Sequence, residues 1–169
     1  MEVIQDEIQG GVIRVLVVDD EPTIREVLTD FLVLEGFEVL CVQSGEEALR
    51  ILDQERFDVA LFDMKMPGMS GLDVLEQLSG QDRHRRLIKL MMTGYGTVET
   101  AIKAMKLGAQ DYILKPFKVH EVIHVIHRAI EQRAIEAENI QLREAVRLHE
   151  VSEAMSDARS LDEIYDLLI

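Results

Sequence analysis

Five short apolar runs, rich in valine, isoleucine and leucine, alternate with amphipathic segments over most of this chain. Their lengths suit β-strands, and their nearly continuous apolar character is typical of strands that are covered on both faces. Strands that alternate with helices predict a doubly wound α/β fold with a parallel sheet. The predicted strands are residues 13–18, 38–42, 59–62, 87–92 and 112–114.

The segments between these runs carry the signals of helix starts. Pro22 stands where the first turn of a helix tolerates proline. Two serine–acid pairs have the spacing of a capping box, in which the serine and the acid satisfy backbone amides at a helix start. These pairs are Ser44 with Glu47 and Ser70 with Asp73.

The last third of the chain has a different pattern. No proline or glycine occurs from residue 118 to residue 169, so we predict an extended C-terminal helix. One row of this helix has the alternating four- and three-residue spacing of a coiled-coil seam, with a polar residue inside it. The seam is Ile135, Asn139, Leu142, Val146 and His149. It predicts a homodimer, and the alternative is a solvated helix without a partner.

These patterns divide the chain into three parts. Residues 12–130 form the α/β domain, residues 131–156 a helical linker or coiled coil, and residues 157–169 the start of a following domain. The last part ends in an apolar run without a cap, and we expect it to be truncated. Its sequence resembles the opening helix of GAF-type sensory domains.

Charge and composition limit where such a chain acts. The formal net charge is −14, which opposes contact with nucleic acid or with anionic lipid. The chain starts without a signal-peptide pattern, has no apolar stretch long enough for a membrane helix and contains a single cysteine. We therefore expect a cytoplasmic protein that acts on other proteins. One basic run, residues 83–89, is interpreted as a solvated loop and not as a nucleic-acid patch.

Polar residues stand at the ends of four predicted strands. They are Asp19 and Asp20, Asp63, Thr93, and Lys115. Because sites in a doubly wound sheet form outside the carboxyl ends of the strands, these side chains can converge on one pocket. The alternative is that the strand-end aspartates only cap the following helices.

Such a pocket would have a definite chemistry. Clustered carboxylates repel each other and require protonation or a cation, and hard oxygen ligands favour Mg²⁺. Asp63 can act as a nucleophile towards phosphorus, while Lys115 supplies positive charge and the Thr93 hydroxyl donates to a phosphoryl oxygen. The pattern predicts a magnesium-assisted phosphoacceptor aspartate.

Four motifs resemble the receiver domains of two-component response regulators. They are VLVVDDEP, LFDMKMPGMSG, MMTGYG and GAQDYILKPF. The separations agree with the family pattern, with 30 residues from Asp63 to Thr93 and 22 from Thr93 to Lys115. The resemblance covers residues 12–130 and implies a flavodoxin-like sheet of order 2-1-3-4-5.

The resemblance also assigns roles to residues. Asp63 would accept a phosphoryl group from a sensor histidine kinase or a phosphotransfer protein, and Lys115 would contact the phosphoryl group. Mg²⁺ would be held by Asp19, Asp20, Asp63 and the backbone carbonyl of Lys65. Thr93 and Tyr112 would form the switch pair, and a cis peptide bond is expected between Lys115 and Pro116. Such a protein is a phosphoacceptor and not a conventional enzyme.

Two other functions remain open at this point. One is a constitutive coiled-coil dimerisation or scaffold module in which phosphorylation is vestigial. The other is a zinc-dependent hydrolase, because HEVIH at residues 120–124 formally matches the H-E-x-x-H pattern. No third zinc ligand is identifiable for this pattern.

Overall fold

The computed structural model describes the backbone of residues 11–94 and 98–167 and, within these ranges, side chains up to residue 149. The chain divides into two compact units, Met1–Ile130 and Glu131–Ile169. The first unit contains the sheet and the second contains the greater part of the C-terminal helix.

The sheet of the first unit has five strands, all parallel, in the order β2-β1-β3-β4-β5. This order confirms the predicted doubly wound fold, and each strand begins and ends within one residue of its predicted run. The strands are β1 (Arg14–Val18), β2 (Glu38–Val42), β3 (Val59–Asp63), β4 (Ile88–Thr93) and β5 (Asp111–Leu114).

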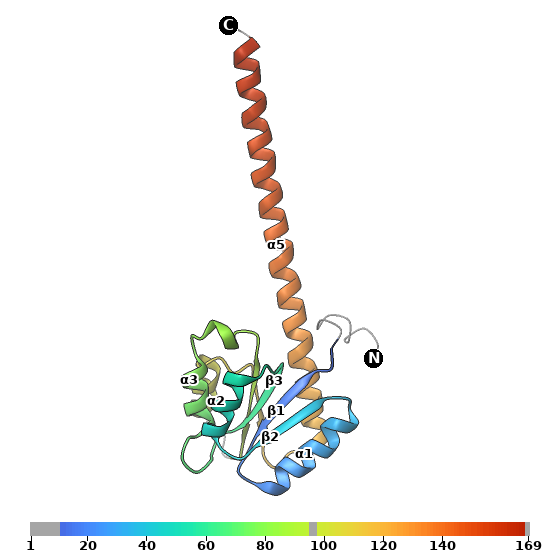
Figure 1. Cartoon of the computed structure of the whole chain (residues 1–169), viewed down its shortest axis with the longest axis vertical. Coiled ribbons are helices and arrows are strands. Elements are labelled where there is room, and N and C mark those ends of the chain that lie inside the picture. Colours follow the sequence, from blue (N-terminus) through green and yellow to red (C-terminus); the bar gives the residue numbers. More distant parts are fainter. Residues whose placement is uncertain (1–10, 95–97, 168–169) are drawn as a thin grey trace. The chain divides into compact units, whose positions relative to one another are not determined.

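Helices cover both faces of the sheet, and Figure 1 shows α2 and α3 on one face and α1 on the other. Alternate residues of β1 and β3 enter the two cores, so that Leu16 and Phe62 pack with α2, α3 and α4, whereas Val17 and Leu61 pack with α1 and α5. The helices are α1 (Pro22–Leu34), α2 (Gly45–Gln54), α3 (Gly71–Leu78), α4 (Val98–Lys106) and α5 (Val119–Leu167), with a short 3-10 turn η1 (Asp82–His84).

The helix-start predictions are confirmed at α1 and α3 and half-confirmed at α2. Pro22 begins α1, and Ser70 and Asp73 form the complete reciprocal box at α3. At α2, the Ser44 hydroxyl oxygen accepts a hydrogen bond from the backbone N–H of Glu47. The Glu47 carboxylate instead accepts from the backbone N–H of Gln43, one residue earlier than predicted.

The helix α5 has two kinds of surface. Within the first unit, Val122 and Ile126 are fully buried in the core shared with α1. Within the second unit, the predicted seam residues Ile135, Leu142 and Val146 are all more than half exposed. No helix in the described residues is long and apolar enough to cross a membrane.

The basic run at residues 83–89 is exposed at Arg83, Arg85 and Arg86, as the predicted solvated loop requires, but two of its other basic residues are buried. His84 is 5% exposed and Lys89, inside β4, is 8% exposed. Burial, with the charge of Arg83, lowers the pKa of His84. Arg83 donates hydrogen bonds to the backbone and the side chain of Asp53 at the end of α2.

Candidate functional site

The carboxyl ends of the strands bring the predicted site residues together. Asp63 is the last residue of β3, Asp19 and Asp20 follow β1 directly, and Lys115 follows β5. One carboxylate oxygen from each of Asp19, Asp20 and Asp63 lies within 4.8 Å of the others. The aspartates therefore form an acidic pocket and are not merely separate helix caps.

Lys115 supplies the opposing charge in this pocket. Its Nζ lies 2.7 Å from Oδ2 of Asp19, 3.2 Å from Oδ2 of Asp63 and 3.6 Å from Oε1 of Glu21. Burial alone lowers the pKa of Lys115, but the hydrogen bonds and charges of Asp19 and Asp63 outweigh it and raise the pKa above its ordinary value. The ammonium group therefore stays charged beside the carboxylates.

Asp19 is the most firmly held of the acids. It is fully buried, its backbone N–H donates to the Val42 carbonyl, and its Oδ1 accepts from the backbone N–H of Glu21 at 2.9 Å. The Arg25 guanidinium, on the first turns of α1, donates to the Asp19 carbonyl at 2.6 Å. Arg25 was not predicted as a site residue, although a basic residue one turn into the helix after an acidic strand end was a usable signal.

The ionisation of Asp63 reflects its position in the pocket. Burial raises the pKa of Asp63, the charge of Lys115 lowers it and the charge of Asp19 raises it again, so that the pKa stands above its ordinary value. The backbone of Lys65, beside this carboxylate, acts in the opposite direction and lowers its pKa. Ionisation of Asp63 therefore lowers the stability of the folded protein when no metal ion is bound in the pocket.

The raised pKa of Asp63 predicts how the stability of the protein depends on pH. When an acid has a higher pKa in the folded than in the unfolded protein, the free energy of unfolding falls as the pH rises from the unfolded-state pKa to the folded-state pKa. In the presence of a chelator, Asp63→Asn should therefore raise the urea midpoint at pH 7. The gain should vanish below pH about 3.8, where the carboxyl group is protonated in both states.

Asp73 provides a control of opposite sign. Hydrogen bonds from Ser70 lower the pKa of this exposed carboxylate, so Asp73→Asn should slightly lower the midpoint at pH 7. A lower urea midpoint for Asp63→Asn than for the wild type at pH 7 would contradict the conclusion that ionisation of Asp63 destabilises the folded protein.

The predicted switch residues lie on neighbouring strands. Thr93 ends β4 and is 3% exposed, whereas Tyr112 on β5 is 43% exposed. Met91 is paired with Tyr112 in the sheet, so Tyr112 and Thr93 are on the same sheet face, two residues apart in register. The expected cis peptide bond between Lys115 and Pro116 is present.

The start of α3 packs tightly against the phosphoacceptor strand. A Cβ atom at Gly71 would lie 2.2 Å from the carbonyl oxygen of Asp63 and 3.0 Å from Cε of Met91. Only glycine allows the helix to begin so close to Asp63. Gly71 lies within a receiver-like motif but was not predicted as a site residue, because the contact joins two elements and leaves no local pattern.

The donor set of the acidic pocket fits a hard divalent cation. Three carboxylates offer hard oxygen ligands at close range, and Mg²⁺ is usually held by one or two carboxylates together with waters. Among the residues whose side chains are described, this is the one group of three or more potential ligands. His120 and His124 of the HEVIH sequence are exposed on α5, and the described residues provide no third ligand beside them, so the structure does not support the zinc-hydrolase alternative.

Comparison with known proteins agrees with this geometry. Residues 15–127 match the family model of the response regulator receiver domain. The regulatory protein AtoC of Escherichia coli is 35% identical over 133 residues, which are 79% of this chain and 28% of AtoC. The response regulator protein FleR of Pseudomonas aeruginosa is 40% identical over 115 residues, 68% of this chain and 24% of FleR. The chain thus spans about a quarter of the length of these relatives.

A solved structure is also similar. The CheY-like response regulator receiver domain protein from Methanospirillum hungatei superposes with a TM-score of 0.68 at 31% identity, covering 75% of this chain and 99% of that protein. Receiver domains of this type are phosphoacceptors and not catalytic enzymes, and the Asp19/Asp20/Asp63 pocket with Lys115 is typical of them. By its sequence, its sheet order and its acidic pocket, the chain belongs to the response regulator receiver domain family.

Proposed function

We propose that Asp63 accepts a phosphoryl group from the phosphohistidine of a sensor kinase or phosphotransfer protein, in the cytoplasm. The observation that carries this proposal is the placement of the Asp63 carboxylate, 5% exposed and 3.2 Å from the Lys115 ammonium. A nucleophile beside a fixed positive charge and two further acids suits phosphoryl transfer, where positioning and charge neutralisation do most of the catalysis.

The transfer itself is a simple displacement. A carboxylate oxygen of Asp63 attacks phosphorus, and the P–N bond to the donor histidine breaks. The electron pair of that bond stays on the imidazole nitrogen, and an acyl phosphate remains on Asp63. Lys115 is already within reach of the Asp63 carboxylate and would contact one phosphoryl oxygen. The Thr93 hydroxyl would donate a hydrogen bond to another.

Mg²⁺ is the proposed cofactor. Asp19, Asp20 and Asp63 would hold it with the backbone carbonyl of Lys65 as a further ligand. When bound, the ion supplies positive charge for the phosphoryl oxygens. Removal of divalent cations should therefore abolish phosphorylation.

The proposed output is a conformational switch. Thr93 would move towards the phosphoryl group, and the half-exposed Tyr112 would turn inward on the same sheet face. A population shift of this kind reaches an output module only if the two states differ in their contacts with it. We propose that residues 131–156 form the helical linker and that residues 157–169 begin the following, GAF-like domain.

The experiment uses a small phosphodonor. With acetyl phosphate and Mg²⁺, the intact protein should gain the mass of one phosphoryl group, and hydroxylamine should remove it. Asp63→Asn should gain none, and neither should the wild-type protein in excess chelator. A modification of Asp63→Asn equal to that of the wild type would refute the assignment.

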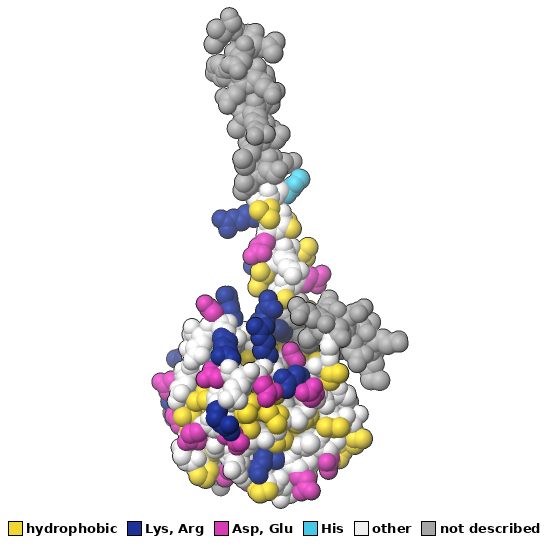
Figure 2. Space-filling view, in the orientation of Figure 1, with side chains coloured by type: hydrophobic (Ala, Val, Ile, Leu, Met, Phe, Trp, Pro, Cys, Tyr) yellow, Lys and Arg dark blue, Asp and Glu magenta, His cyan; other side chains and the backbone are white. Residues whose placement is uncertain are grey.

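The exposed row on α5 supports a proposed homodimer. Ile135, Leu142 and Val146 are 53%, 56% and 58% exposed, and they share one helix face, as coiled-coil seams do. Figure 2 shows hydrophobic side chains between charged ones along the described part of this helix. Apolar positions of this spacing are stabilised when a second copy covers them.

A substitution on the seam tests the dimer. Leu142→Lys should shift the protein from dimer to monomer in light scattering, because a dimer would bury the two introduced ammonium groups. Ile140→Lys is the matched control, since Ile140 is equally exposed at 56% but lies off the seam. Equal effects of both substitutions would contradict the seam. A dimer that is unchanged by beryllofluoride and Mg²⁺ would favour the constitutive scaffold.

A further inference from the structure

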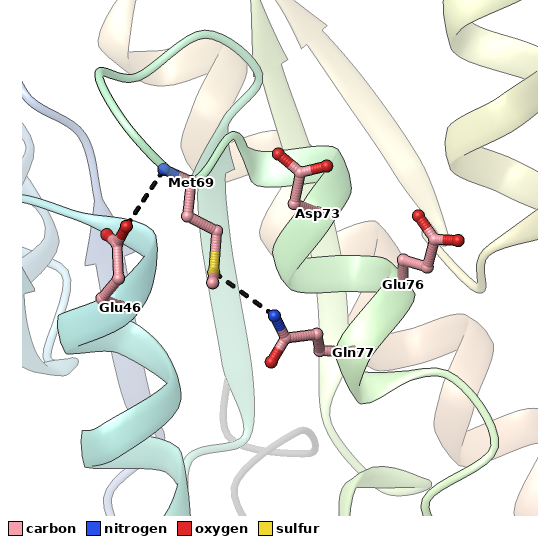
Figure 3. A pocket seen from close by; sticks show the side chains of 5 residues that line it. All are labelled: Glu46, Met69, Asp73, Glu76 and Gln77. Carbon is pink, nitrogen blue, oxygen red and sulfur yellow. Dashed lines mark hydrogen bonds between the residues drawn. The ribbon is translucent and has the colours of Figure 1, made fainter.

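The loop between β3 and α3 follows the phosphoacceptor directly and is held from outside by α2. Glu46, in the first turn of α2, accepts a hydrogen bond through Oε1 from the backbone N–H of Met69 at 3.1 Å. Figure 3 shows Glu46 and Gln77 reaching Met69 from different helices, the first at its backbone and the second at its sulfur. The Gln77 amide lies 3.9 Å from Sδ of Met69.

Two glycines show how closely α2 approaches the loop. A Cβ atom at Gly68 would lie 3.0 Å from Oε1 of Glu46, and the φ angle of Gly68 is +75°. A Cβ atom at Gly45 would lie 2.9 Å from the carbonyl oxygen of Met69. The Glu46 carboxylate therefore lies directly against the backbone of Gly68 and Met69.

The two ends of the loop are fixed by other contacts. At the β3 end, the backbone N–H of Met64 donates to the Met92 carbonyl at 2.8 Å. At the α3 end, the Ser70–Asp73 capping box holds the first turn. Glu46 adds an anchor from a separate helix between these ends.

We propose that Glu46 is a positioning residue for the phosphoacceptor: its bond to Met69 fixes the loop that follows Asp63, so that the backbone of Lys65 keeps its place beside the Asp63 carboxylate. This inference rests on the proposed function of Asp63 for its effect on phosphorylation. The position of Lys65 can be measured without any phosphodonor.

The cavity beside this contact provides a matched control. It has a volume of about 520 Å³ and is lined by Glu46, Met69, Asp73, Glu76 and Gln77. Glu46 and Glu76 are both exposed helix residues, so truncation of either leaves the core intact. Glu76 lines the cavity from α3, and Figure 3 draws no hydrogen bond from it to Met69.

The test compares Glu46→Ala, Glu46→Gln and Glu76→Ala with the wild type. Amide hydrogen exchange at Lys65 and the rate of phosphorylation by acetyl phosphate are the two measurements. Glu46→Ala should accelerate exchange at Lys65 and slow phosphorylation, each about fivefold, the equivalent of one net hydrogen bond. Glu46→Gln keeps an acceptor oxygen and should behave as the wild type, as should Glu76→Ala.

The outcomes separate this inference from the proposed function. Unchanged Lys65 exchange and phosphorylation in Glu46→Ala would overturn the positioning role. Equal losses in Glu46→Ala and Glu46→Gln would overturn it too, since the acceptor would then be irrelevant. If no variant and no wild-type protein is phosphorylated but Lys65 exchange rises only in Glu46→Ala, the proposed function fails and the positioning role stands.

Discussion

Lys115→Met should slow the phosphorylation of this protein by acetyl phosphate roughly a hundredfold, the typical effect of removing one preorganised donor from a reacting charge. The Lys115 ammonium lies 2.7 Å from Asp19 and 3.2 Å from Asp63, and no water separates groups at these distances. Its loss leaves the clustered carboxylates without that counter-charge and removes one of the two positive charges, with the proposed Mg²⁺, that would oppose the charge of the phosphoryl group. The rate of mass gain in intact-protein mass spectrometry measures the effect.

Lys118→Met is the control for this substitution. Lys118 is exposed and lies three residues further along the same connection to α5, so the control removes the same charge without touching the pocket. Its rate should equal that of the wild type. A Lys115→Met rate within threefold of the wild type would show that the fixed charge is not needed.

Gly71→Ala should lower the free energy of unfolding by about 3 kcal/mol, at the upper end of what overpacking usually costs. The new methyl group would lie 2.2 Å from the carbonyl oxygen of Asp63, and a backbone oxygen cannot move aside as a flexible side chain can. The better helix propensity of alanine offsets at most about 1 kcal/mol of this. Urea denaturation measures the loss, and phosphorylation should slow as well because Asp63 is displaced.

Gly11→Ala is the matched control, since a Cβ atom there has no neighbour within 4 Å. It should leave the unfolding midpoint unchanged. A stability of Gly71→Ala equal to that of the control would mean that α3 does not start against Asp63 as the structure shows.

The strands and the acidic pocket could be predicted because both depend on local patterns. A strand buried on both faces leaves a continuous apolar run, and parallel strands place their carboxyl ends at one edge. Asp19, Asp63 and Lys115 stand next to such runs, so their convergence followed once the fold was known. The pairing of Tyr112 with Met91 was not predicted, because strand order does not define the register of two strands.

The residues that support the pocket were not predicted, for two different reasons. Arg25 bonds the Asp19 carbonyl only six residues away, so its signal was local but was not used. Glu46 reaches Met69 from a different element, across a gap that only tertiary packing closes. Two residues of the basic run depart from the predicted solvated loop for the same reason as Glu46. His84 turns into the core, and Lys89 occupies an interior position of a buried strand, which a count of charges cannot reveal.

The measurement that tests the central claim most directly is the location of the acyl phosphate. Wild-type protein is phosphorylated by acetyl phosphate with Mg²⁺, reduced with borohydride, digested and sequenced by mass spectrometry. Borohydride converts an aspartyl phosphate to homoserine, and we expect this change at Asp63 and at no other acid of the pocket. Homoserine at Asp19 or Asp20, or no reduction at Asp63 in a protein that has gained a phosphoryl group, would contradict the assignment.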